Sequence, residues 1–270
     1  MQSQLRPDGW DEGVILAFQN EPATRKHAVD LPGGGILLFF TQDVSVLERI
    51  AAEVDALLSW LGTPPGFTVH LWWRDDPRRI DATQWPTKRE VNGGWAIPGI
   101  PKIYVYRAEE YDRVLIHETI HAMEWDWKMP ETPLPCWGLA QDAVVAPALF
   151  EAWTELYAEW LWCGWHDVAW EDQRAYQDEQ AIQLFARLLP RQQGGVTQWR
   201  EDTNLFAYYV LKAALAPHVA FLWVFGNGST PDERDRVLCG LVEPELRRLR
   251  EAAAHTEPRA LSMRMTLAKK

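Results

Sequence analysis

The sequence lacks any long apolar run, including at its start. The longest uninterrupted apolar candidate, His218–Phe225, is far shorter than the roughly 20 residues that a membrane-spanning helix requires. The opening residues, MQSQLRPDGWDEG, do not contain the apolar core of a signal peptide. We therefore expect a soluble protein of the cytoplasm or another intracellular compartment, without a membrane partner.

Basic residues and cysteines are also few. Lysine and arginine total 27 against 38 aspartate and glutamate residues, so the formal net charge is −11. Because phosphate binding requires concentrated positive charge, nucleic acid is not expected as a partner. The three cysteines, Cys136, Cys163 and Cys239, form no CxxC spacing, which fits a reducing compartment and argues against thiolate ligation of a metal.

The pattern of apolar residues divides the chain into a mixed first part and a helical second part. Strands are predicted at Val14–Phe18, Ile36–Thr41, Phe67–Trp73 and Lys102–Arg107, with a helix at Asp43–Leu61 and a long loop at 74–101. A proline-rich connector at 128–141 precedes helical patterns at about 147–164, 167–189, 200–215 and 232–254.

These patterns predict an α+β fold. A small mixed α/β part, residues 1–126, would end in the helix that carries the motif described next, and a mainly helical part, residues 127–270, would follow. We expect the two parts to form one compact catalytic unit, with the functional site in the cleft between them. The sequence does not indicate an oligomeric state.

Five consecutive residues, His117-Glu118-Thr119-Ile120-His121, form an HExxH pattern. On a helix, residues four apart lie on the same face, so both imidazoles can bind one metal ion. Neutral imidazole nitrogens bind zinc at about 2.0–2.1 Å. Glu118 would lie beside the first ligand, where its carboxylate can take a proton from metal-bound water. Apolar residues at positions 114–116 and 120 predict that the motif lies on a helix.

A catalytic zinc ion usually has a third protein ligand. The residues after His121 contain neither the glycine nor the histidine of the extended HExxHxxGxxH pattern. Two later glutamates, Glu151 and Glu155, lie four residues apart among aromatic and aliphatic residues, so they share one face of a predicted helix. One of these carboxylates can bind the metal while the other accepts a hydrogen bond from a ligand histidine and orients it.

An HExxH helix followed by a helix with two acidic residues resembles the gluzincins, the thermolysin-like and aminopeptidase-like zinc peptidases. In that family the second helix carries a glutamate ligand, in sequences such as NExxSD or NEGFA. The resemblance implies that Glu151 is the third zinc ligand and that Glu155 is the carboxylate that supports a ligand histidine. This chain has Phe150 in place of the family's asparagine and a glutamate in place of thermolysin's aspartate, so Glu155 stays open as the alternative ligand.

The resemblance also covers residues before the motif. In gluzincins an edge strand precedes the HExxH helix, lines the cleft and pairs with extended peptide, and Lys102–Arg107 occupies that place. By the same resemblance, Asn92, Gly93, Gly94 and Tyr104 are candidate substrate-binding residues. The GxMEN motif of the family's aminopeptidases is absent here, so endopeptidase or carboxypeptidase action is expected rather than aminopeptidase action.

Gluzincins stabilise the oxyanion of their reaction with a tyrosine or histidine from the C-terminal helical region. Two neighbouring tyrosines, Tyr208 and Tyr209, are the candidates that the resemblance suggests, with His218 and His166 as further candidates. A donor directed at developing negative charge is usually the contact that contributes most to the rate.

Together these patterns predict a zinc-dependent metallopeptidase with one Zn²⁺ held by His117, His121 and Glu151. Water activated by the zinc would hydrolyse the peptide bond of a peptide or protein substrate, with Glu118 as the general base. Two alternatives stay open. The chain could be a catalytically inactive zinc-binding protein on a peptidase scaffold that acts as a protein-interaction module, or a helical interaction module without metal.

Overall fold

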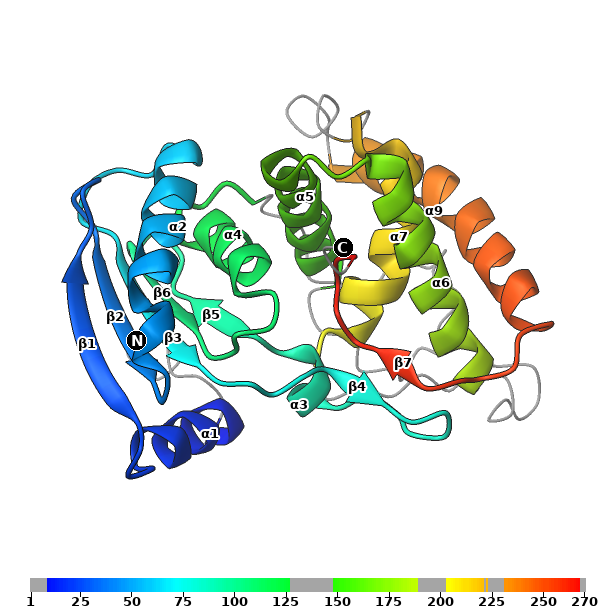
Figure 1. Cartoon of the computed structure of the whole chain (residues 1–270). Helices are drawn as coiled ribbons and strands as arrows, with labels where there is room; N and C mark the ends of the chain where they lie inside the picture. The colour runs from blue at the N-terminus through cyan, green and yellow to red at the C-terminus, as the bar shows by residue number, and fades with distance from the viewer. Residues whose placement is uncertain (1–8, 127–147, 189–202, 221, 223–230, 268–270) are drawn as a thin grey trace. The chain divides into compact units, whose positions relative to one another are not determined.

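The structure, a computed structural model, describes residues 9–126, 148–188, 203–220, 222 and 231–267 (Figure 1). The chain forms two compact units. We call the first, Met1–Pro77 with Gly93–Trp125, the sheet unit, and the second, Arg78–Asn92 with Asp126–Lys270, the helical unit. The predicted α+β fold is confirmed, with a mixed sheet followed by a mainly helical part. Residues 78–92 belong to the helical unit, and the predicted connector at 128–141 lies outside the described residues.

A five-stranded sheet forms the centre of the sheet unit, in the order β1-β2-β3-β6-β5. The strands are β1 (Arg25–Asp30), β2 (Ile36–Thr41), β3 (Thr68–Trp73), β6 (Lys102–Val105) and β5 (Gly94–Ala96). β2, β3 and β6 are parallel to one another, whereas β1 and β5 run antiparallel to their neighbours. Parallel neighbours need a crossover connection, and α2 (Leu47–Trp60) provides the one between β2 and β3.

The predicted strand at Val14–Phe18 is wrong, because these residues belong to helix α1 (Gly9–Gln19). Ile15 and Phe18, three residues apart and therefore on one side of a helix, pack against Phe40 and Trp72 of the sheet. A short apolar run does not distinguish a strand from a buried helix segment, so tertiary packing decided between them. Strand β1 was not predicted from the sequence, because most of its side chains are exposed and show no apolar alternation.

The strand before the motif helix is an interior strand of the sheet. β6 pairs in parallel with β3 on one side and antiparallel with β5 on the other. The prediction of an edge strand at Lys102–Arg107 is therefore wrong, and β5 lies at that end of the sheet instead. β5 comes from the predicted loop at 74–101, which also contains β4 (Arg79–Ile80) and α3 (Lys88–Val91). Elements this short contain too few residues for a periodic signal.

Helices make up most of the helical unit, near the positions of the four predicted helical patterns. They are α5 (Ala148–His166), α6 (Trp170–Leu188), the π-helix η4 (Phe206–Leu211) continued by α7 (Lys212–Leu215) and η5 (Ala216–His218), and α9 (Pro231–Ala253). Their apolar sides form one core, in which Trp153, Phe185, Phe206 and Leu249 are almost fully buried. No helix in the described part of the chain is long and apolar enough to cross a membrane.

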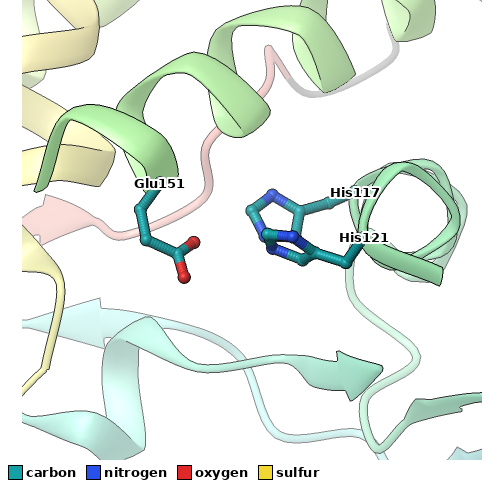
Figure 2. A group of neighbouring side chains, drawn as sticks. All are labelled: His117, His121 and Glu151. Atoms are coloured by element: carbon teal, nitrogen blue, oxygen red, sulfur yellow. The ribbon is translucent and has the colours of Figure 1, made fainter. Parts of the chain in front are cut away.

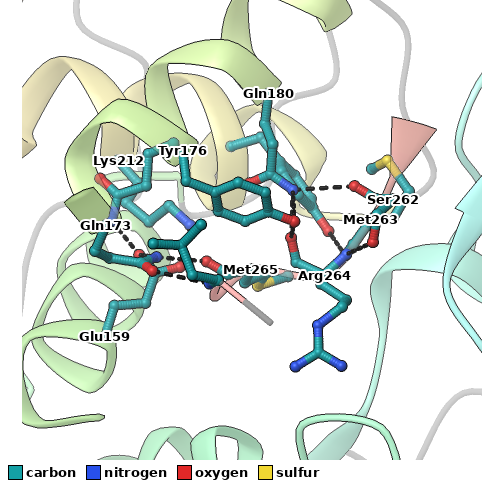
Figure 3. Close-up of polar contacts among 12 residues, drawn as sticks. Glu159, Gln173, Tyr176, Gln180, Lys212, Ser262, Met263, Arg264 and Met265 are labelled. Carbon is teal, nitrogen blue, oxygen red and sulfur yellow. Dashed lines mark hydrogen bonds and ion pairs between the residues drawn. The ribbon is translucent and has the colours of Figure 1, made fainter. Parts of the chain in front are cut away.

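A buried ion pair lies among these helices (Figure 3). Lys212 of α7 and Glu159 of α5 are fully buried, and their charged groups are in contact. Glu159 also accepts a hydrogen bond from Gln173 Nε2 at 3.0 Å and another from Gln177, both on α6. Removing one partner of a buried pair typically costs about 3–5 kcal/mol, because the other charge is left uncompensated. The network therefore ties α5, α6 and α7 into one arrangement.

The C-terminal segment of the chain is bound to α6 through its main chain (Figure 3). Gln173 donates a hydrogen bond to the carbonyl oxygen of Met265 at 2.7 Å, and Gln180 donates one to that of Ser262 at 3.1 Å. Next to these contacts, β7 (Leu261–Ser262) pairs antiparallel with β4. The end of the chain thus connects β4 to α6, which explains why residues 78–92 belong to the helical unit.

The described cysteines differ in their chemistry. Cys163 is a free, buried thiol, and burial together with the charge of Glu159 raises its pKa to about 12. Such a thiol stays protonated at neutral pH and is a poor nucleophile. Cys239 is disulfide-bonded, which does not fit the expectation of a reducing compartment.

Candidate metal centre

The HExxH residues lie on helix α4 (Tyr111–Ala122), as their spacing predicts. Every residue of α4 is buried, and the polar side chains His117, Glu118 and His121 are 5%, 5% and 8% exposed. The helix packs against β5 and β6 of the sheet unit. In its first turn, the carboxylate of Asp112 accepts a hydrogen bond from the main-chain N–H of Arg113 at 2.9 Å, which suits the positive end of the helix dipole.

The two histidine rings converge on one point beside α4. Their Nε2 atoms are 3.0 Å apart, and their ring centroids are 4.7 Å apart. Two nitrogens bound to one zinc ion in tetrahedral geometry, each at the usual Zn–N distance, would be separated by roughly 3.3 Å. The observed separation is close to this value, so these two nitrogens of α4 could bind one cation.

Glu151 supplies the third donor. One ligand atom of each of His117, His121 and Glu151 lies within 4.8 Å of the other two, so these residues could hold a metal ion (Figure 2). Glu151 lies in the first turn of α5 and is half-buried. Two neutral imidazoles and one carboxylate form a donor set that catalytic zinc sites use, so the chemistry of the donors fits such an ion.

The alternative ligand Glu155 is not part of this group among the described residues. Glu151, Glu155 and Glu159 follow one another at intervals of four on α5 and therefore share one face of the helix. Their burial increases along the face, since Glu151 is half-buried while Glu155 and Glu159 are 1% and 0% exposed. Glu151, the carboxylate that the resemblance implies, is the one that belongs to the group that could hold a metal ion.

The edge strand β5 passes directly beside Glu118. A Cβ atom at Gly94 would lie 2.5 Å from the main-chain oxygen of Tyr104, 2.7 Å from Val114 Cγ1 and 3.2 Å from Glu118 Cγ. The main chain of β5 therefore approaches α4 as closely as only glycine permits. The close approach brings the edge of the sheet into contact with the candidate general base.

Gly94→Ala is expected to destabilise the sheet unit, because the new methyl group would meet main-chain and buried side-chain atoms at 2.5 and 2.7 Å. We expect a loss of about 1–3 kcal/mol in the free energy of unfolding, the usual cost of overpacking. Gly240→Ala in α9 is the matched control, since a Cβ there meets nothing within 4 Å and alanine favours a helix. Urea denaturation compares the two variants, and equal stabilities would contradict the close approach.

The two residues before Gly94 make hydrogen bonds within the protein. The carbonyl oxygen of Gly93 accepts a hydrogen bond from the main-chain N–H of Tyr106 at 3.0 Å. The side chain of Asn92, in the helical unit, accepts one from the hydroxyl of Thr203 at 2.7 Å. Neither Thr203 nor the close packing of Gly94 was predicted. The signal for the latter was present in the sequence, because glycine in a strand often marks the close approach of another backbone.

Tyr104 lies on the sheet face that is turned away from α4. It pairs in register with Trp95, while Gly94 pairs with Val105. The rings of Tyr104 and Trp95 stack with centroids 4.3 Å apart, whereas Gly94 is in contact with α4. Side chains alternate between the two faces of a sheet, so the side chain of Tyr104 lies on the face opposite the helix that carries Glu118. Gly94, one of the predicted substrate-binding residues, lies against the motif helix.

The two candidate tyrosines have different partners. Tyr208 is half-buried, and its hydroxyl donates a hydrogen bond to Glu151 Oε2 at 3.1 Å. Tyr209 is fully buried, and its hydroxyl donates one to the main-chain carbonyl of Met263 at 2.7 Å. Tyr208 therefore contacts a member of the metal-binding group, while Tyr209 belongs to the core of the helical unit.

The further histidine candidates have other surroundings. His166, the last residue of α5, packs edge-on against Trp162 with ring centroids 4.7 Å apart. His218 is the last residue of η5. Neither histidine belongs to the group of described residues that could hold a metal ion.

No protein-family model, no curated protein and no solved structure matches the chain. What the chain does must therefore be inferred from its own residues.

Proposed function

We propose that this chain is a zinc-dependent metallopeptidase of the gluzincin type. His117, His121 and Glu151 would hold the zinc ion, and the approach of their donor atoms within 4.8 Å is the observation that carries the proposal. Three protein ligands are typical of catalytic zinc sites, whereas structural sites usually have four. When bound, zinc supplies Lewis-acid chemistry, which polarises a carbonyl oxygen and lowers the pKa of water.

Glu118 is the general base in this proposal. It follows His117 directly on α4 and is 5% exposed, so its carboxylate is largely shielded from solvent. The carboxylate takes a proton from water as the water oxygen forms its bond to the scissile carbonyl carbon. The same group then gives that proton to the leaving amine as the carbon–nitrogen bond breaks. One residue thereby serves both halves of the hydrolysis.

The proposed substrate is a peptide in extended conformation. The edge strand β5 supports this choice, because the main chain at Gly94 lies against the side chain of Glu118. An extended peptide can add to a sheet edge as a further strand, with its main-chain N–H and C=O groups making the contacts. The absence of the GxMEN glutamate favours an endopeptidase or carboxypeptidase over an aminopeptidase.

Removal and return of the metal test this proposal. We expect the purified chain to contain about one zinc ion, as a single three-ligand site predicts. Cleavage of a mixed peptide library, followed by mass spectrometry, should stop after dialysis against a chelator and return when zinc is added. Bound zinc without cleavage of any peptide would instead support the inactive zinc-binding protein. A chain that binds no zinc would refute the metal centre.

A further inference from the structure

The π-helix η4 directs two adjacent tyrosines to different partners. Tyr208 donates to the carboxylate of Glu151, and Tyr209 donates to the carbonyl of Met263. π-helical turns are rare and are found frequently at functional sites. η4 packs against α5, the helix that carries Glu151. The contact between Tyr208 and Glu151 is thus built into the packing of these two helices.

Asn204 also contacts the phenol oxygen of Tyr208. Its Nδ2 donates to the Tyr208 hydroxyl at 3.4 Å, and its main-chain carbonyl accepts a hydrogen bond from the N–H of Tyr208 at 2.9 Å. An amide N–H can only donate, so it occupies a lone pair of the phenol oxygen. The phenol hydrogen is therefore directed to Glu151, and a hydrogen bond to an ionised acceptor is stronger than one between neutral groups.

The buried ion pair of the helical unit holds Tyr208 in place. Lys212 lies four residues after Tyr208, and Glu159 lies eight residues after Glu151, so the two contacts fall on the same faces of their helices. Sliding η4 and α7 along α5 would separate Lys212 from Glu159, both of which are fully buried. Breaking such a pair is strongly unfavourable. The hydroxyl of Tyr208 consequently keeps its position at Glu151.

We propose that Tyr208 is a positioning residue for Glu151 and determines how this carboxylate binds the metal. Because the phenol engages Oε2, the carboxylate would be held in one orientation and would bind the metal through a single oxygen. Outer partners of this kind raise metal affinity by orienting the ligand before the metal arrives. This role differs from the oxyanion contact that the resemblance implies, since the tyrosine acts on a ligand and not on the substrate. It rests on the metal-binding part of the proposed function.

Tyr208→Phe and Tyr209→Phe form a matched pair, because each removes one hydroxyl from neighbouring positions of the same π-helix. Zinc affinity is measured for the wild-type chain and both variants by competition with a chromophoric chelator. Tyr208→Phe should weaken zinc binding roughly 10–100-fold. Tyr209→Phe should leave zinc affinity unchanged and lower the thermal midpoint of the metal-free chain, because the buried carbonyl of Met263 loses its partner.

Cobalt(II) substitution adds a readout that a merely structural role would not change. In Tyr208→Phe the carboxylate of Glu151 would lose the contact at Oε2 and would be free to bind the metal through both oxygens, which would raise the coordination number. The visible absorption of cobalt should then weaken, because tetrahedral cobalt absorbs more strongly than cobalt with more ligands. Asn204→Ala should weaken zinc binding and the cobalt absorption as Tyr208→Phe does, but by a smaller amount. This substitution removes the side chain that donates to the Tyr208 hydroxyl.

Wild-type zinc affinity and an unchanged cobalt spectrum in Tyr208→Phe would overturn the positioning role. If Tyr208→Phe bound zinc as tightly as the wild type but cleaved peptide more slowly at saturating zinc, the hydroxyl would act on the substrate. This result would also overturn the positioning role. A wild-type chain that binds zinc without cleaving any peptide would refute the peptidase function, while weakened zinc binding in Tyr208→Phe would still support the positioning role. A wild-type chain that binds no zinc would overturn both.

Discussion

Glu118→Gln is expected to abolish most peptide cleavage while leaving the metal bound. Glutamine has nearly the same shape as glutamate but cannot take the proton from water or return it to the leaving amine. Loss of such a group should lower kcat about 10²–10⁴-fold. The two histidines keep their positions on α4, and Glu118 is not among the three residues whose donor atoms converge. The measurements are kcat on a peptide selected from the library and zinc content by mass spectrometry, on the same preparation.

Glu124→Gln is the control for this substitution. Glu124 is exposed, lies just beyond the end of α4, and is not part of the metal-binding group. Its substitution removes the same charge from the same region and should leave both kcat and zinc content at the wild-type level. If Glu118→Gln cleaved at the wild-type rate, another group would have to take the proton. If it lost zinc, the main role of Glu118 would be to support the ligands.

Glu151→Gln is expected to lose the metal, whereas Glu155→Gln is expected to retain it. The two residues lie one turn apart on α5, and only Glu151 joins the histidines in the group that could hold a metal ion among the described residues. An amide is a much weaker zinc ligand than a carboxylate, so Glu151→Gln should lose at least on the order of 100-fold in zinc affinity, the upper end of the range for outer-shell changes.

Zinc content after gel filtration and zinc affinity by chelator competition compare the two variants. Glutamine preserves side-chain volume, which matters at Glu155 because this residue is 1% exposed. If Glu155→Gln lost the metal and Glu151→Gln kept it, Glu155 would be the ligand, the alternative that the helical spacing of the two residues also allows. Loss of metal from both variants, with both chains folded by circular dichroism, would show that the ligand depends on its neighbour along α5.

The local part of the site could be predicted from the sequence because its geometry is the geometry of one helix. His117 and His121 are four residues apart, and an α-helix brings residues at this spacing to one face. The structure places them on α4 with Nε2 atoms 3.0 Å apart. The second helix was also predictable, since α5 is long and carries Glu151 and Glu155 within an apolar pattern.

The strand beside the motif helix could not be placed in the same way. Lys102–Val105 has the apolar character of a strand, but its sequence does not indicate whether one or two other strands pair with it. Its outer neighbour β5 consists of Gly94–Ala96, which is too short for a periodic pattern. α1 presents the same difficulty, since only the contacts of Ile15 and Phe18 with the sheet distinguish it from a strand.

The sequence by itself determined the pair of histidines, the adjacent Glu118 and the division into a mixed and a helical part, because these follow from spacing within single elements. Only the tertiary structure decided that Glu151 is the carboxylate grouped with the histidines, that β5 is the strand beside Glu118, and that Tyr208 rather than Tyr209 contacts Glu151. These choices depend on the packing of segments far apart in the chain and on a π-helical turn, and neither leaves a periodic signal in the sequence.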